Sequence, residues 1–406
     1  MKARIEHEAF TEAVRWGTRN VPIRPTVPSL SCALIEAEGE RLDISCFDYE
    51  TSSRISVPAT VAEPGRALVP GRVLADIARA LPAERVEFSV EMGRARLVCG
   101  EVRFHLPTMP VEDYPTPPPM PAVAGVADAA AFSHAVAQTA VAAGRDDTLP
   151  VLTGIELALA ERIGLAATDR YRMAVADLDW RPKHTAPAKA LVPARTLAAL
   201  AKSLGAVGGE VTIGANVDEE GTVGLIGFTA GERSSVSRVL DGHLPDLRAL
   251  IALEYPTRLR VDTAALALAA RRVSLVADRD ARLRLIAQDG RLTVESGSPE
   301  GTADGTETIA CEYEGEPLRL AFNPVYIAEA LAAVDAPVTV FSVDAAGQRV
   351  LVTGERDGGG DAGGGAGADG AAGKAKAGKR GGGAGRAQAG KATEFRQLLR
   401  TLRWTE

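Results

Sequence analysis

The pattern of apolar and polar positions along the chain repeats itself. Residues 67–81 and 190–204 share nine of their 15 amino acids, and both contain an apolar strand end, a proline and an Ala/Leu-rich helix. A weaker third copy covers residues 322–334. Self-similarity of this kind indicates that one structural unit occurs several times. We therefore expect three copies of a single unit.

A second helix is expected upstream in each copy. Residues 6–18, 127–143 and 263–276 carry apolar side chains at helical spacing. Alternating apolar and polar residues between the helices predict short antiparallel strands, as at residues 41–47, 94–99 and 291–295. Each unit should hold two helices and roughly eight strands, which is an α+β fold.

Two links separate the copies. Residues 115–121 form a proline run that must be extended and stiff, and a second link lies near residues 253–256. The predicted domains are residues 1–121, 122–254 and 255–406. Three units joined end to end by rigid links would form an arc rather than a globule.

A glycine-rich insert interrupts the third unit. Residues 357–392 contain 15 glycines and no apolar side chain larger than alanine. Such a composition cannot bury a core, so we expect this insert to be disordered. Order should resume at residues 393–404 as a final strand or a short helix.

Composition narrows the class of protein. Hydrophobic residues make up 46% of the chain, but no apolar run approaches the ~18–20 residues of a membrane span. The charged N-terminus lacks a signal peptide, so we expect a cytoplasmic protein with no membrane partner. The four cysteines form no CxxC pair and the five histidines are isolated, which predicts no metal site and no disulfide.

Charge is distributed unevenly on the predicted elements. The net charge is −7, yet the helices carry basic residues while the strand-rich segments hold much of the acid. A basic helical face would attract a phosphate backbone without reading its bases. The alternative is that these are ordinary solvated helix faces. The basic residues in question include Arg72, Arg79, Arg195 and Lys202, with Arg24 in a loop.

A polar and basic stretch at residues 168–175 lies between apolar runs near the middle of the chain. A strand, a tight corner and another strand would place Arg170, Tyr171 and Arg172 at a sheet edge. Taken alone, this stretch is most simply a solvated hairpin tip.

Motifs for catalysis are lacking. The sequence has no GxSxG and no HExxH. Asp146 and Asp147 leave a metal-dependent hydrolase open, although they also fit a local turn. Together with the triplication, this favours a scaffold over an enzyme.

Five strings in this chain resemble one family. They are RPTVP at residues 24–28, LPTMPVEDYP at 106–115, LPVLTG at 149–154, ATDRYRMAV at 167–175 and DGHLPD at 241–246. They occur in family order across residues 1 to about 355. In combination they are similar to the bacterial sliding clamp, the beta subunit of DNA polymerase III, and most of all to its actinobacterial members.

The resemblance implies a non-enzymatic protein without a cofactor. Three clamp domains per chain would pair head to tail as a homodimer, and the ring would surround duplex DNA without sequence specificity. The clamp would tether the replicative DNA polymerase, would be opened by the clamp loader, and would bind repair polymerases and other proteins through short clamp-binding peptides.

The resemblance also assigns residues to sites. The DNA-facing residues would be Arg24, Arg72, Arg79, Arg195 and Lys202. The dimer interface would include Phe104, Leu106 and Val273. The peptide-binding cleft would comprise Leu152, Thr168, Arg170, Tyr171, Arg172, Met173, Pro245, Leu250, Ala346, Leu398 and Arg400.

The sequence departs from the family at the C-terminal tail. Residues 400–404 read Arg-Thr-Leu-Arg-Trp where the family has Met-Pro-Val/Met-Arg-Leu. The helix at residues 327–334 also offers no basic side chain. These departures suit an alternative function, a clamp-like regulatory paralogue that binds partners or the clamp loader without encircling DNA.

Overall fold

The repeated segments form the same local structure in each copy. β6 (Gly65–Pro70) leads directly into α2 (Gly71–Ala80), and β14 (Ala188–Pro193) leads directly into α4 (Ala194–Gly205). In the third copy β22 (Leu318–Phe322) precedes α7 (Pro324–Ala333). There the Asn323 side chain accepts a hydrogen bond from Val325 N and caps the helix.

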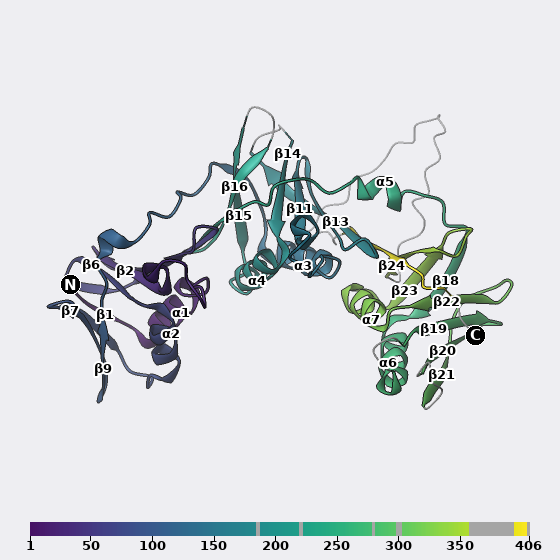
Figure 1. Cartoon of the computed structure of the whole chain (residues 1–406), viewed down its shortest axis with the longest axis horizontal. Helices are drawn as coiled ribbons and strands as arrows, with labels where there is room; N and C mark the ends of the chain where they lie inside the picture. Colours follow the sequence, from purple (N-terminus) through teal and green to yellow (C-terminus); the bar gives the residue numbers. More distant parts are fainter. Residues whose placement is uncertain (184–186, 219–221, 278–280, 298–302, 357–393, 404–406) are drawn as a thin grey trace, which may run out of the picture. The chain divides into compact units, whose positions relative to one another are not determined.

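The structure is a computed structural model, drawn in Figure 1. It describes residues 1–406 except 184–186, 219–221, 278–280, 298–302, 357–393 and 404–406. The insert predicted to be disordered, residues 357–392, therefore lies outside the described residues, as does Trp404. The tail is a strand as far as Arg400 rather than a helix.

Apart from β5, which occurs only in the first copy, the remaining elements recur in the same order three times. The first copy holds β1 (Lys2–Ile5), α1 (His7–Gly17), β2 (Cys32–Glu38), β3 (Arg41–Phe47), β4 (Thr51–Pro58), β5 (Thr60–Glu63), β7 (Val86–Glu91), β8 (Arg94–Cys99) and β9 (Val102–Pro107). The second holds β10 (Val123–Asp128), α3 (Ala129–Ala140), β11 (Gly154–Leu159), β12 (Arg162–Thr168), β13 (Arg172–Pro182), β15 (Glu210–Val217), β16 (Val223–Ala230) and β17 (Arg233–Arg238). The third holds β18 (Thr257–Asp262), α6 (Thr263–Val273), β19 (Leu283–Gln288), β20 (Arg291–Gly297), β21 (Asp304–Ala310), β23 (Val338–Val343), β24 (Arg349–Glu355) and β25 (Glu394–Arg400). This confirms the predicted α+β fold of three tandem units.

The helices agree with the sequence pattern within a few residues. α3 ends at Ala140 and is therefore shorter than predicted. α6 ends at Val273 and is followed by a 3-10 turn at Ser274–Val276. None of the helices in the described part of the chain is long and apolar enough to cross a membrane.

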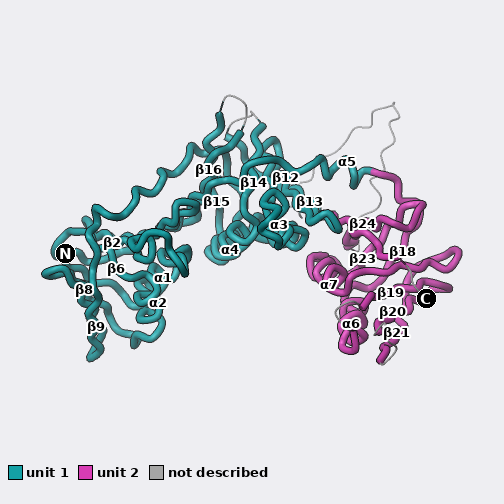
Figure 2. The backbone as a smooth tube through the Cα atoms, in the orientation of Figure 1, with its two compact units in different colours: residues 1–252, 393–395 teal, residues 253–392, 396–406 magenta. Residues whose placement is uncertain are grey.

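The chain divides into two units, coloured separately in Figure 2. The first comprises residues 1–252 and 393–395, and the second residues 253–392 and 396–406. In the first unit β17 pairs antiparallel with β4, so that one sheet runs from the first copy into the second. The second unit contains a four-stranded sheet in the order β21-β20-β19-β22.

Side chains reinforce the junction between the first two copies. Trp16 on α1 is buried and donates from Nε1 to the carbonyl of Arg54 at 3.0 Å. The guanidinium of Arg233, on β17, lies 5.4 Å from the centre of that ring and forms an ion pair with Glu12. The same guanidinium donates to the carbonyl of Ser203 at the end of α4. One arginine therefore connects α1, β17 and α4.

Candidate functional site

The polar stretch at residues 168–175 forms the expected hairpin. β12 and β13 pair antiparallel up to Thr168 and Met173, and residues 169–171 make the turn. The Asp169 carboxylate accepts hydrogen bonds from the backbone N–H groups of Tyr171 and Arg172, each at 3.0 Å. Arg170 has a φ of 79°, in the left-handed region that side chains rarely adopt. The carboxylate of Asp169 therefore accepts two of the backbone hydrogen bonds that stabilise the turn.

The three polar residues at the tip have different environments. Tyr171 is 56% exposed and Arg170 is also exposed, as expected for a sheet edge. Arg172 is only 3% exposed, so of the three residues expected at the sheet edge it is the one whose side chain is buried. Its Nε lies 3.0 Å from Asp169 Oδ2, and this ion pair keeps the buried guanidinium compensated.

Two neighbouring segments connect with this hairpin. Hydrogen bonds from Thr148, and to a smaller extent the charge of Arg170, lower the pKa of the Asp146 carboxylate. After that loop comes a 3-10 turn, Pro150–Thr153, which contains the half-buried Leu152. Val151 in this turn packs against Gly242, where a Cβ would come within 3.0 Å of Val151 Cγ2.

The segment after Gly242 supplies exposed side chains. Pro245 is exposed, and Leu250 lies 36% exposed on α5 (Leu247–Ile251). Asp246 caps α5 by accepting from Arg248 N and Ala249 N. Pro245, Leu250 and the half-buried Met173 are therefore accessible apolar side chains in this part of the first unit, and Arg248 is an accessible basic one.

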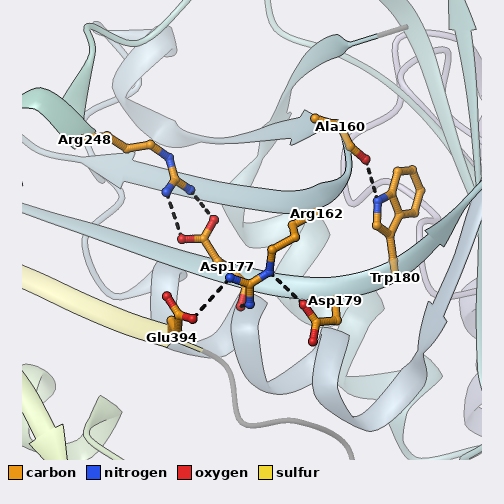
Figure 3. Close-up of polar contacts among 7 residues, drawn as sticks. All are labelled: Ala160, Arg162, Asp177, Asp179, Trp180, Arg248 and Glu394. Carbon is orange, nitrogen blue, oxygen red and sulfur yellow. Dashed lines mark hydrogen bonds and ion pairs between the residues drawn. The ribbon is translucent and has the colours of Figure 1, made fainter. Parts of the chain in front are cut away.

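A network of ion pairs holds α5 and the hairpin strands together (Figure 3). Arg248 forms two hydrogen bonds with Asp177 on β13. Arg162 on β12 lies 2.7 Å from Asp179 and 3.3 Å from Glu394. Burial acts to lower the pKa of Arg162, but the surrounding carboxylates outweigh it and raise the pKa. The sequence analysis did not identify Arg248 as part of the site. Its position between the predicted cleft residues Pro245 and Leu250 could have indicated it.

Three predicted cleft residues belong to the second unit. Ala346, in the turn between β23 and β24, and Arg400, at the end of β25, are both exposed. Leu398 is 2% exposed because it pairs opposite Leu351 and points into a core. Leu398 therefore packs beneath the strand, and its assignment to the cleft stays a prediction from the family resemblance.

The predicted DNA-facing residues are all exposed. Arg24 lies in the loop after α1, Arg72 and Arg79 lie on α2, and Arg195 and Lys202 lie on α4. Arg79 forms an ion pair with Asp76 at 2.6 Å, which offsets part of its charge. In the third copy α7 carries no basic residue and exposes Val325, while Arg272 on α6 is paired with Glu307.

The predicted dimer residues are less accessible than expected. Leu106 is 5% exposed and Val273 is 4% exposed, because both face the core of their own sheet or helix pair. Phe104 is half-buried. One exposed apolar side chain nearby is Leu275, which is 81% exposed and lies two residues after Val273. The assignment by resemblance named Val273 and not Leu275, and it stays a prediction.

The acidic pair considered for hydrolysis forms a local turn. Asp146 Oδ1 accepts from the N–H and hydroxyl of Thr148 at 3.0 and 2.6 Å. Within the described ranges, no group of three or more His, Cys, Asp or Glu side chains is placed to hold a metal ion. The two hydrogen bonds from Thr148 fit the turn interpretation of Asp146.

Comparison with known proteins covers all three units. Residues 1–118, 127–246 and 248–359 match the models of the N-terminal, central and C-terminal domains of the DNA polymerase III beta subunit. The chain is 42% identical to the beta sliding clamp of Streptomyces coelicolor over 87% of this chain and 94% of that protein. It is 43% identical to that of Micrococcus luteus over 77% of this chain and 100% of that protein.

A solved structure has the same fold. The DnaN sliding clamp of Pseudomonas aeruginosa bound to griselimycin superposes with a TM-score of 0.84 at 23% identity, covering 100% of both chains. With three domain models in order and two relatives above 40% identity, the chain belongs to the family of DNA polymerase III beta subunits, the beta sliding clamps.

Proposed function

We propose that this protein is a DNA sliding clamp. Two copies would close head to tail into a ring around duplex DNA and tether the replicative polymerase to its template. The observation that carries the proposal is the 42% identity that extends over 94% of a beta sliding clamp. The proposed domains are residues 1–121, 122–254 and 255–406.

Exposed cations on the helices support the DNA contact. Arg72 and Arg195 occupy the same position in α2 and α4, directly after the first helical residue. The first and second copies therefore each carry an arginine at this position. Such residues neutralise phosphates without reading bases, so binding should be weak, non-specific and sensitive to salt. Arg24, Arg79 and Lys202 are proposed to add to the same contact.

Free strand edges support the ring. Among the described strands, β9 lies at one edge of the sheet β5-β1-β7-β8-β9, and β21 lies at one edge of the sheet β21-β20-β19-β22 in the second unit. An edge strand offers unpaired backbone groups that a second copy can satisfy. β9 exposes Arg103 and β21 exposes Asp304, so these two side chains carry opposite charges. Leu275 would add an apolar contact in place of Leu106 and Val273.

The hairpin at residues 168–173 is proposed as the wall of the cleft for partner peptides. Tyr171, Leu250 and Pro245 are exposed, and such apolar groups beside the cationic Arg170 suit a short peptide with hydrophobic anchors. Peptides from the replicative polymerase, the clamp loader and repair polymerases are the expected ligands. The assignment of Ala346 and Arg400 to the same site rests on the resemblance to the family.

The proposed role is topological and not catalytic. We assign the chain no enzymatic activity and no cofactor, and we place it in the cytoplasm. The clamp loader would open the ring, since closed rings cannot thread onto circular DNA by themselves.

Solution mass and retention on DNA test this function together. We expect a dimer that, once loaded by the clamp loader, stays on nicked circular DNA and slides off the same DNA after linearisation. A stable monomer that is not retained on the circle would overturn the proposal and favour the regulatory paralogue.

The cleft needs a separate test. Tyr171→Ala or Met173→Ala should weaken the binding of griselimycin and of a labelled peptide from the replicative polymerase, and should leave the dimer intact. Unchanged affinity for both ligands would show that the peptide site does not lie at this hairpin.

A further inference from the structure

The turn that presents Tyr171 also occurs in the first copy. There Asp48 Oδ1 accepts from the N–H groups of Glu50 and Thr51 at 3.0 and 2.6 Å, and Tyr49 has a φ of 74°. In the second copy Asp169 and Arg170 take these two roles, with a φ of 79° at Arg170. The chain therefore contains two examples of one backbone turn, only one of which lies in the proposed cleft.

The turn in the second copy has additional side-chain contacts. The third residue after the aspartate is Thr51 in the first turn and Arg172 in the second. Arg172 gives the aspartate a second partner, because its Nε lies 3.0 Å from Asp169 Oδ2. Thr168, just before the aspartate, donates from Oγ1 to the carbonyl of Arg172 at 2.7 Å and accepts from Arg170 N at 3.1 Å.

Burial makes these contacts depend on one another. The side chains of Arg172 and Asp169 are 2% and 13% exposed, so a charge left alone there would be poorly solvated. One carboxylate therefore satisfies two backbone donors and one buried cation at the same time. Tyr171, between these contacts, remains 56% exposed with its backbone fixed on both sides.

We propose that Asp169 is a positioning residue of the peptide cleft, which acts through Arg172 and the turn to hold Tyr171 in its ligand-binding orientation. Of the two arginines in this stretch, Arg172 is part of the scaffold, and Arg170 is the cation that meets the ligand. This inference rests on the proposed function of the hairpin. A loose tip would have to be ordered when the ligand binds, which lowers affinity.

The test measures griselimycin affinity of the full-length chain for Asp169→Ala, Asp169→Asn and Tyr171→Ala. We expect Asp169→Ala to weaken binding by about tenfold, because a charge-assisted hydrogen bond and two backbone bonds are removed. Asp169→Asn keeps an acceptor at Oδ1 and should recover part of this loss. Asp48→Ala is the matched control, since it breaks the same turn away from the cleft, and it should leave affinity unchanged.

A double-mutant cycle separates positioning from general damage. If Asp169 acts through Tyr171, the combined variant should bind no worse than Tyr171→Ala alone. Additive losses, or Asp169→Ala with the affinity of the parent chain while Tyr171→Ala is weakened, would overturn the inference. If Tyr171→Ala itself has no effect, the proposed cleft fails instead. Should Asp169→Ala not fold, Asp169→Asn with the same cycle decides the question.

Discussion

The guanidinium of Arg248 holds the carboxylate of Asp177 through two hydrogen bonds of 2.8 and 2.7 Å. Arg248 lies in α5 between Pro245 and Leu250, and Asp177 lies on β13, the strand that leaves the Tyr171 turn. The guanidinium passes over Gly164, where a Cβ would come within 2.7 Å of Nη2. This ion pair therefore fixes one proposed wall of the cleft to the other.

Arg248→Gln should loosen α5 without unfolding the chain. The side chain is 44% exposed, so we expect a stability loss of about 1 kcal/mol or less, but a several-fold loss of affinity for the labelled partner peptide. Fluorescence titration and thermal melting measure the two effects. Arg181→Gln, which breaks an exposed ion pair with Glu210, is the control and should change neither. Equal affinity of Arg248→Gln and the parent chain would show that α5 needs no such anchor.

The salt dependence of DNA binding should report the helix cations. Arg72→Gln and Arg195→Gln should each lower the slope of log K against log salt by about 0.9 for every phosphate that is no longer neutralised. Arg79→Gln should have a smaller effect, because Asp76 already offsets that charge. Anisotropy with a labelled duplex over a range of salt concentrations gives the slopes. Arg85→Gln, whose side chain pairs with Glu6, serves as the control, and an effect as large as that of Arg72→Gln would argue against a specific DNA face.

Much of the fold could be predicted from the sequence because its signals are local. The duplicated segment located α2 and α4, and apolar alternation located β3 and β8 at Arg41–Phe47 and Arg94–Cys99. The burial of Arg172 could not be predicted in this way. It depends on Asp169 three residues earlier and on packing beneath the hairpin, whereas the local pattern treats all three polar residues of the tip alike.

The dimer residues illustrate the same limit. Phe104, Leu106 and Val273 are apolar at plausible positions, yet the fold turns Leu106 and Val273 inward. Only the end of α6 at Val273, followed by a 3-10 turn, makes Leu275 protrude. Helix ends depend on a few backbone hydrogen bonds and are the least certain feature of a sequence pattern.

Leu275→Ala and Leu106→Ala should therefore behave in opposite ways. Leu275 is 81% exposed, so its truncation should weaken the dimer and leave the fold of each monomer stable. Truncation of the buried Leu106 should cost about 2–5 kcal/mol of unfolding free energy through a cavity. Sedimentation over a range of concentrations and urea unfolding distinguish the two variants. A dimer unaffected by Leu275→Ala would place the interface elsewhere.

The ion pair between Arg272 and Glu307 should make stability depend on pH in the acid range. A hydrogen bond from Arg272 lowers the pKa of Glu307 below its ordinary value of about 4.3. The stabilisation is therefore present above that value and is lost as the pH falls through the lower, folded-state pKa. Melting temperatures of the parent chain and Glu307→Gln should differ at neutral pH and converge in acid. A constant difference at every pH would mean that the pair contributes nothing through its charge.

Arg170→Gly should separate stability from binding at the tip of the hairpin. At a φ of 79° an arginine is strained, by about 1 kcal/mol, whereas glycine adopts this conformation freely. The added flexibility of glycine in the unfolded chain offsets part of this gain, so thermal stability should stay equal or rise slightly. Binding of an acidic partner peptide should weaken and lose part of its salt dependence, because the exposed cation is gone. Tyr49→Gly, at a φ of 74° in the first copy, should match the stability change without affecting the peptide. A loss of stability in Arg170→Gly would mean that the arginine side chain stabilises the turn by more than its backbone strain costs.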